Sequence, residues 1–296
     1  MQNIEPVQLR QVRDLGQIIT STFQFLKQNW KPLFRAIGTV VVPLALVAGF
    51  FMGKSVGDLQ GLVYSGTLSG DPYAMLGKIS GNMLPMLGGY VLLFAAVMLL
   101  IAMVHEYIRL YDLGQHHGVT TGQLFSLATG QLGSYIGAGI LSGLLVVAGA
   151  ILCIIPAFYP LTVLSLVLIV HAIERKGATG SMSRSNELVQ GRFWDTLGLV
   201  IVIGLVSAVV SYAIMLPLTI VGAFMGFNGI MAMAEGDAGA MDGYSVFISA
   251  QMAIQMAVTV LTYPIVYVGL SLKYFSLVEE EEGAGLRQKV EGFESI

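Results

Sequence analysis

Long apolar runs alternate with short polar segments along the whole chain, and six of these runs are long enough to cross a membrane. A bilayer-crossing helix needs about 20 mostly apolar residues, and each run lies near or above that length. We therefore predict six transmembrane helices. Their expected bounds are Leu33–Met52, Met86–Leu110, Ser134–Ile155, Ala157–Ile173, Thr196–Met225 and Val246–Leu272.

Four prolines mark where these helices should turn or bend. The third and fourth runs form one tract, and we expect a tight hairpin at Pro156 and Pro160 because proline cannot continue the hydrogen-bond ladder of a helix. The fifth and sixth runs are longer than a bilayer requires and contain Pro217 and Pro264. We expect those two spans to tilt or to kink at the prolines.

A different pattern occupies Leu15–Asn29, where apolar residues at helical spacing face polar ones. An amphipathic helix this polar should lie in the membrane interface rather than cross it. Similar segments begin at Thr120 and Ser181, before the third and fifth spans. Each of the three units would be an interfacial helix, a break and two spans, with the breaks at Asn29, Gly130 and Gly191.

These patterns predict an all-α integral membrane protein with six transmembrane helices and three interfacial amphipathic helices. The membrane domain should extend over residues 1–278, and an acidic cytoplasmic tail should follow over residues 279–296. Glycine pairs at four-residue spacing should let helix backbones approach closely inside the bundle. They are Gly49 and Gly53, Gly133 and Gly137, Gly139 and Gly143, and Gly222 and Gly226.

Composition supports the membrane class. Hydrophobic residues make up 55% of the 296 residues and charged residues only 11%, against about 25% charged in soluble domains. A folded soluble chain of this size cannot hide so much apolar surface. Soluble enzymes, nucleic-acid binders and disordered chains are therefore excluded, and the net charge of -3 gives no reason to expect a nucleic-acid partner.

The basic residues predict the orientation. Thirteen of the fifteen lysines and arginines fall on one side of the predicted spans, and only Lys54 and Lys78 fall on the other. Because basic residues concentrate on the cytoplasmic side, we expect a multi-pass protein of the cytoplasmic (inner) membrane with both termini in the cytoplasm. The thirteen are Arg10, Arg13, Lys27, Lys31, Arg35, Arg109, Arg175, Lys176, Arg184, Arg192, Lys273, Arg287 and Lys289.

Histidines and nearby acids near the expected cytoplasmic helix ends are the candidates for a metal site. A metal site needs convergent ligands, but no HExxH motif holds these residues together, so we favour polar residues at the headgroup level. No GxSxG motif is present either. We expect no catalytic residues, no bound metal and no cofactor. The residues considered are His105, Glu106, Asp112, His116, His117, His171 and Glu174.

A polar stripe runs through the sixth span at four-residue spacing, formed by Gln251, Gln255, Thr259 and Tyr263. Polar side chains in a span should face protein or a wet cavity rather than lipid. The stripe therefore serves either as interhelical hydrogen bonds or as one wall of a substrate cavity. We favour the first, because uncharged Gln and Thr commonly join helices.

The stretch from the fourth span into the fifth carries a distinctive motif. Glu174 ends the span, and a new apolar helix follows the positions Arg184, Ser185, Leu188, Gly191, Phe193 and Trp194. This arrangement resembles the multi-span membrane domain associated with bacterial glycerophosphodiester phosphodiesterases and related stand-alone bacterial membrane proteins. The resemblance implies six helices with interfacial elements. It implies no phosphodiesterase activity, because the soluble catalytic domain of the fused members has no counterpart here.

Together these observations predict a non-enzymatic integral membrane protein that acts as a scaffold, an assembly factor or a lipid-organising component. The alternative is a small-molecule or lipid transporter with a cavity beside the sixth span. The expected partners are membrane lipids and other membrane proteins, and the oligomeric state is left open.

Overall fold

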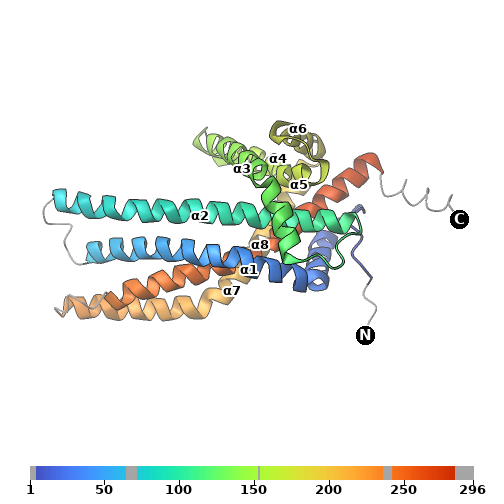
Figure 1. Cartoon of the computed structure of the whole chain (residues 1–296). Coiled ribbons are helices and arrows are strands. Elements are labelled where there is room, and N and C mark those ends of the chain that lie inside the picture. Colours follow the sequence, from blue (N-terminus) through green and yellow to red (C-terminus); the bar gives the residue numbers. More distant parts are fainter. Residues whose placement is uncertain (1–4, 65–71, 153, 236–241, 284–296) are drawn as a thin grey trace. The chain divides into compact units, whose positions relative to one another are not determined.

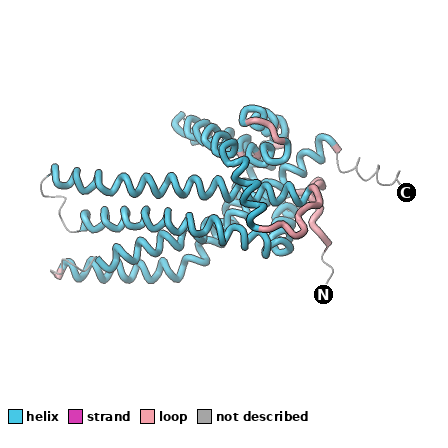
Figure 2. The backbone as a smooth tube through the Cα atoms, viewed as in Figure 1, coloured by secondary structure: helices cyan, strands magenta, loops and turns pink. Residues whose placement is uncertain are grey.

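The computed structural model describes residues 5–64, 72–152, 154–235 and 242–283, and every regular element in those ranges is an α-helix. Short loops join most of the helices (Figure 2). The predicted all-α class is therefore confirmed. The helices shown in Figure 1 are α1 (Leu15–Tyr64), α2 (Pro72–Asp112), α3 (Thr121–Leu152), α4 (Ile154–Leu164), α5 (Val167–Glu174), α6 (Ala178–Val189), α7 (Phe193–Ala234) and α8 (Asp242–Glu282).

Five of the described helices, α1, α2, α3, α7 and α8, are long and apolar enough to cross a membrane. A sixth crossing is present if Phe158–Glu174 and Ala178–Val189, which are bent by 117° at the break between them, act as one span. The chain is thus a multi-pass membrane protein by helix length and composition. The predicted fourth span corresponds to α4 and α5, which a turn at Ser165 and Leu166 separates.

Two of the three predicted helix breaks are wrong. α1 continues through Asn29 and α3 continues through Gly130. Asn29 lies inside α1, and its side-chain amide donates to the Phe25 carbonyl one turn earlier. The break at Gly191 is confirmed, since α6 ends at Val189 and Gly191 has a φ of 85°, a conformation that glycine adopts without strain.

The hairpin predicted at Pro156 and Pro160 is also wrong in position. α3 ends at Leu152 and α4 begins at Ile154, so both prolines lie inside α4. α7 and α8 continue past Pro217 and Pro264 without a break.

The chain divides into two compact units. Unit 1 comprises residues 1–36, 98–208 and 263–296, and unit 2 comprises residues 37–97 and 209–262. Unit 1 contains α3 to α6 together with one end of each of the four longest helices, and unit 2 contains the remainder of those four helices. We describe each unit separately.

In unit 2, α1 and α8 approach each other closely at glycines. A Cβ atom built on Gly49 would lie 2.5 Å from the Met252 carbonyl oxygen, and one built on Gly53 would lie 2.7 Å from Ser249 Cα. On α7, Gly222 leaves room for the Gln251 side chain and Gly226 for the Tyr244 ring. These two glycine pairs are confirmed as packing sites.

The glycine pairs of α3 behave differently. Gly139 lies against the Met98 side chain, whereas Gly133, Gly137 and Gly143 have no neighbouring group within 4 Å of a Cβ position in the described chain. Within the described residues, Gly133, Gly137 and Gly143 therefore do not serve close helix packing, whereas Gly139 does.

Unit 1 is held together partly by its N-terminal segment, which precedes α1. The Arg13 backbone N–H donates to Ser276 Oγ at 2.9 Å, and the Arg10 guanidinium pairs with the Asp112 carboxylate at 2.8 Å. The Val7 backbone N–H donates to the Gln28 side chain. Three contacts thus tie this segment to α1, to the end of α2 and to α8.

Candidate functional site

Of the family-like motif residues, Arg184 lies against Glu174, at the end of α5. Its carboxylate accepts hydrogen bonds from Arg184 Nε at 3.3 Å and from the Tyr274 hydroxyl at 3.0 Å. The Lys176 ammonium lies 2.6 Å from its other oxygen. Glu174 thus pairs with Arg184 and Tyr274, and these contacts join α5, α6 and α8.

The other motif residues shape the corner between α6 and α7. The Ser185 hydroxyl donates to the Val163 carbonyl, and Leu188 is buried. Phe193 stacks on Tyr159 and meets Trp194 edge to face. Trp194 is 78% exposed, as an anchor at a membrane surface would be. These contacts join the motif residues to other parts of the chain, which is a structural role.

The start of the predicted acidic tail is helical and paired. Glu281 and Glu282, at the end of α8, bind Arg184, and Glu280 binds Arg192. Because four glutamates at a helix C-terminus oppose the helix dipole, these arginines stabilise the last turn of α8. Residues 284–296 of the predicted tail, including Arg287 and Lys289, lie outside the described residues, as do Cys153 and Asp237.

The polar stripe of α8 makes mixed contacts. Gln251 lies against Gly222 of α7, and the Thr259 hydroxyl donates to the Gln255 carbonyl within α8. The Tyr263 ring meets the Tyr267 ring at 6.0 Å. The Gln251 contact is of the interhelical kind, and the role of the whole stripe stays a prediction.

His105 and His171, two of the residues considered for a metal site, lie near the same tyrosine ring inside unit 1. The Tyr135 ring of α3 lies 6.1 Å from the His105 ring of α2 and 5.1 Å from the His171 ring of α5. Tyr267 of α8 completes this group, 5.9 Å from His105. We call these four residues the buried ring cluster, because His105, Tyr135 and His171 are each less than 5% exposed.

Two polar atoms of the buried ring cluster, the Tyr135 hydroxyl and His171 Nε2, have no hydrogen bond to the described residues. His105 lies against the backbone of Leu168. His171 Nδ1 lies 2.7 Å from the Lys176 carbonyl and donates a hydrogen bond to it.

Glu106 follows His105 in sequence but takes part in a different interaction. Its carboxylate, which is fully buried, lies 2.8 Å from the Arg175 guanidinium and 3.6 Å from that of Arg109. Across the described ranges, no three His, Cys, Asp or Glu side chains converge on a position that suits a metal ion.

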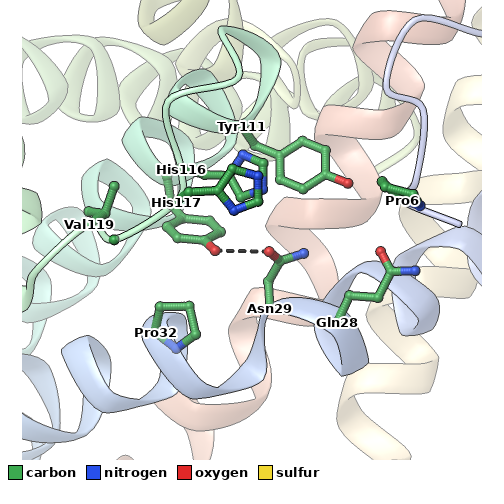
Figure 3. A pocket seen from close by; sticks show the side chains of 10 residues that line it. Pro6, Gln28, Asn29, Pro32, Tyr111, His116, His117 and Val119 are labelled. Atoms are coloured by element: carbon green, nitrogen blue, oxygen red, sulfur yellow. Dashed lines mark hydrogen bonds between the residues drawn. The ribbon is translucent and has the colours of Figure 1, made fainter. Parts of the chain in front are cut away.

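A pocket of about 490 Å³ opens elsewhere in unit 1 (Figure 3). Ligand pockets commonly measure about 300–1,000 Å³. Four segments build it: the N-terminal segment, α1, the end of α2 and the loop before α3. We call it the aromatic pocket, and its lining residues are Pro6, Gln28, Asn29, Pro32, Tyr107, Tyr111, His116, His117, Gly118 and Val119.

The wall of the aromatic pocket is ordered by hydrogen bonds and by tilted ring contacts. The Tyr107 hydroxyl donates to Asn29 Oδ1 at 2.8 Å, as Figure 3 shows. The His116 ring lies between the rings of Tyr111 and His117, at 4.3 and 4.0 Å. The Tyr111 hydroxyl lies against the backbone of Val7, and His116 Nδ1 is buried without a hydrogen bond to the described residues.

Protonation of His116 is disfavoured. Burial, and secondarily the nearby His117, lowers the pKa of His116 below its ordinary value of 6.5. The ring is therefore neutral at pH 7 and offers one donor and one acceptor nitrogen. Sequence reasoning considered both histidines only as metal candidates, and it missed Asn29, Tyr107 and Tyr111 as parts of a site.

Comparisons of the chain with protein-family models, with curated proteins and with solved structures found no match in any of the three. The resemblance to a known membrane domain therefore stays a prediction from the sequence.

Proposed function

We propose that this protein is a non-enzymatic component of the cytoplasmic membrane that acts as a scaffold, an assembly factor or a lipid-organising protein. The observation that carries the proposal is the uncovered surface of α3. Only 11% of the apolar span in α3 is buried within the chain, against 56% in α8. Membrane lipid or another membrane protein must cover the rest.

The uncovered surface of α3 includes a continuous apolar face. Ile140, Leu144, Val147 and Ile151 are between 48% and 80% exposed. Their spacing of four, three and four residues places them on one side of the helix. We call these four residues the α3 face. It has the form of a contact surface for acyl chains or for an apolar helix of a partner.

The contacts of the charged residues support a structural role. Glu106 is neutralised by Arg175 and Arg109, and Glu174 by Arg184 and Lys176. Carboxylates held in this way stabilise helix ends.

The test is purification of the full chain in a mild detergent, followed by native mass spectrometry of the proteins and lipids that remain bound. We expect retained lipids, co-purifying membrane proteins or both. Replacing Leu144 and Ile151 by alanine should reduce this retention without lowering the amount of folded protein. The same change at the exposed Leu84 and Leu87 of α2 is the matched control. Recovery of the parent protein with no lipid and no partner would contradict the proposal.

The orientation belongs to the same proposal. In a Cys153→Ala background, a Lys78→Cys variant should react with a membrane-impermeant thiol reagent added outside intact cells. A Thr179→Cys variant should react only after the membrane is opened. Both positions are exposed in the structure. The reverse labelling pattern would show that the positive-inside assignment is wrong.

The buried ring cluster favours the transporter as a second candidate. Unpartnered polar atoms inside a bundle are costly unless water or a solute reaches them, and Tyr267 lies on the helix that carries the polar stripe. A Gln255→Cys variant, again in a Cys153→Ala background, distinguishes the two candidates. Rapid labelling by a small polar thiol reagent indicates a wet cavity, whereas protection indicates helix packing.

A further inference from the structure

We propose that a small pocket beside Lys273 binds the phosphodiester of a phospholipid headgroup. The inference deepens the proposed lipid-organising function and rests on it. The buried, unpaired ammonium of Lys273 and the charges around it carry the argument.

The pocket lies within unit 1 and is built by the start of α1, the start of α7 and the C-terminal part of α8. Its volume of about 190 Å³ is below the roughly 300–1,000 Å³ of pockets for drug-sized ligands, which suits a headgroup. We call it the Lys273 pocket. Its charged lining residues are Arg13, Asp14, Asp195 and Lys273.

Lys273 is the unpartnered group of this pocket. It is only 7% exposed, and its ammonium has no hydrogen bond and no ion pair with the described residues. The ammonium is also not among the buried polar atoms that are sealed from solvent, so a ligand in the pocket can reach it. A buried charge without a counter-charge is strongly unfavourable, and an anion in the pocket would supply that counter-charge.

Arg13 adds a second buried cation without a carboxylate partner among the described residues. Its guanidinium donates only to neutral oxygens of residues 8–11. Its backbone N–H donates to Ser276 Oγ, which lies one turn after Lys273 on α8, so the Arg13 backbone is fixed near Lys273. We assign to Arg13 a contribution to the positive potential of the pocket rather than a direct contact with the ligand.

The two carboxylates of the lining do not cancel these cations. Asp14 is exposed and caps α1, because its Oδ1 accepts the Gln17 backbone N–H at 2.8 Å. Asp195 attracts Lys273 from beyond ion-pair distance, and its side chain is 66% exposed and lies 4.0 Å from Arg192. Water screens the attraction of exposed carboxylates, so the buried side of the pocket stays positive. The N-terminal ends of α1 and α7 add to this positive potential.

The surroundings of the pocket favour a lipid as the source of the anion. Trp194, which precedes Asp195, is 78% exposed, and tryptophans concentrate at the headgroup level of a membrane, where phospholipids supply the anionic groups. The rest of the lining is apolar and consists of Leu15, Ile18 and Leu199. Because Leu15 is 38% exposed, this wall can continue along the glycerol and first methylenes of a lipid, of which a soluble anion makes no use.

The experiment measures lipid retention by the purified full chain in mixed micelles. The micelles contain equal amounts of phosphatidylglycerol and diacylglycerol with the same acyl chains, so the two lipids differ in the phosphate-bearing headgroup. We expect native mass spectrometry to find phosphatidylglycerol retained about tenfold more than diacylglycerol, the equivalent of one charge-assisted hydrogen bond. Equal retention overturns the phosphate site.

Variants test the location. Lys273→Met removes the ammonium and nearly keeps the length of the side chain, so it should abolish most of this preference. Lys273→Arg keeps the charge and should keep the preference. Lys27→Met removes the same charge from an exposed position of α1 and is the matched control. A preference that Lys273→Met leaves unchanged, or that Lys27→Met lowers equally, overturns the assignment.

Thermal unfolding separates a binding role of Lys273 from a structural one. In a neutral detergent without lipid, Lys273→Met should be at least as stable as the parent, because it removes a buried charge that has no partner. Added phosphatidylglycerol should then raise the unfolding temperature of the parent more than that of the variant. A variant that is less stable without lipid and gains as much from phosphatidylglycerol as the parent would show that Lys273 is structural.

Free phosphate distinguishes the two sources of the anion. Inorganic phosphate at millimolar concentration should displace phosphatidylglycerol only weakly, because it gains nothing from the apolar wall. If inorganic phosphate alone raises the unfolding temperature as much as the lipid does, a soluble phosphate is the ligand and the lipid source is wrong. Equal retention of the two lipids overturns the phosphate site alone, whereas loss of all lipids and partners contradicts the proposed function itself.

Discussion

Replacing Gly49 by alanine should weaken the contact between α1 and α8 in unit 2. The added methyl group would lie 2.5 Å from the Met252 carbonyl oxygen and 2.6 Å from Ala253 Cα. Both neighbours are backbone atoms, so no side-chain rotation can relieve the clash. The two helices would have to separate by about 1 Å, because carbon atoms pack at about 3.5–4.0 Å.

Two contributions lower the free energy of unfolding of Gly49→Ala. Overpacking of a close contact destabilises by about 1–3 kcal/mol, and separation also weakens the neighbouring contact at Gly53. The same substitution at Gly38, on the same helix and with nothing within 4 Å, should stabilise by up to about 1 kcal/mol because alanine favours the helix. The helix-propensity gain applies to both variants and cancels in the comparison, so we expect them to differ by about 1–3 kcal/mol in the free energy of unfolding.

The assay is equilibrium unfolding of the parent and both variants in mixed micelles of increasing dodecyl sulfate content, followed by far-ultraviolet circular dichroism. Gly49→Ala should unfold at a lower fraction of dodecyl sulfate than the parent, and Gly38→Ala at the same or a higher fraction. If the two variants unfold together, the close approach of α1 and α8 does not exist in the folded protein.

Three further outcomes follow from the described contacts. Replacing Gln251 and Gln255 together by leucine should change the free energy of unfolding by only about 1 kcal/mol if they join helices, and a stable but inactive variant would show that they line a cavity. Arg175→Ala should destabilise the chain by about 2–3 kcal/mol, because it weakens the pairing of the buried Glu106 carboxylate. Adding Glu106→Gln to this variant should restore part of the lost stability. An unchanged thermal unfolding temperature in Arg175→Ala would refute this. The pKa of His116 is lowered in the folded chain, so the unfolded chain binds the proton more tightly. The contribution of His116 to stability is therefore fully present above pH 6.5 and is lost as the pH falls through the folded-state pKa. His116→Phe should make thermal stability less dependent on pH between 7 and 5, and an unchanged dependence would contradict this.

Hydrophobic periodicity was sufficient to predict the helices and the membrane class, but it could not show where helices end. Gly191, Gly130 and Asn29 are all residues that often end helices. Only Gly191 does so here, with its positive φ. The side chain of Asn29 instead bonds within α1 and to Tyr107 of α2, and a contact across 78 residues leaves no trace in a local pattern.

The aromatic pocket was beyond sequence reasoning for a similar reason. Pro6, Asn29, Tyr107 and His116 come from four segments that lie far apart in the sequence. One signal was available, since Tyr107 and Tyr111 are one helical turn apart and share a face with an apolar core. Periodicity identifies such a face but cannot say what lies opposite it. The Glu174–Arg184 pair was predictable because only ten residues separate its partners.

The continuity of α1 has a consequence for how much of the protein the bilayer can hold. A helix of 50 residues is about 75 Å long, whereas the hydrocarbon core is about 30 Å thick. Even a tilt of 40°, the upper end of the usual range, brings only about 26 residues into the core. About half of α1 must therefore extend into the headgroup region or the water beyond it, and α2, α7 and α8, with 41, 42 and 41 residues, do the same to a smaller degree. A fragment trimmed to twenty residues for each of these spans would discard at least as much helix as it keeps.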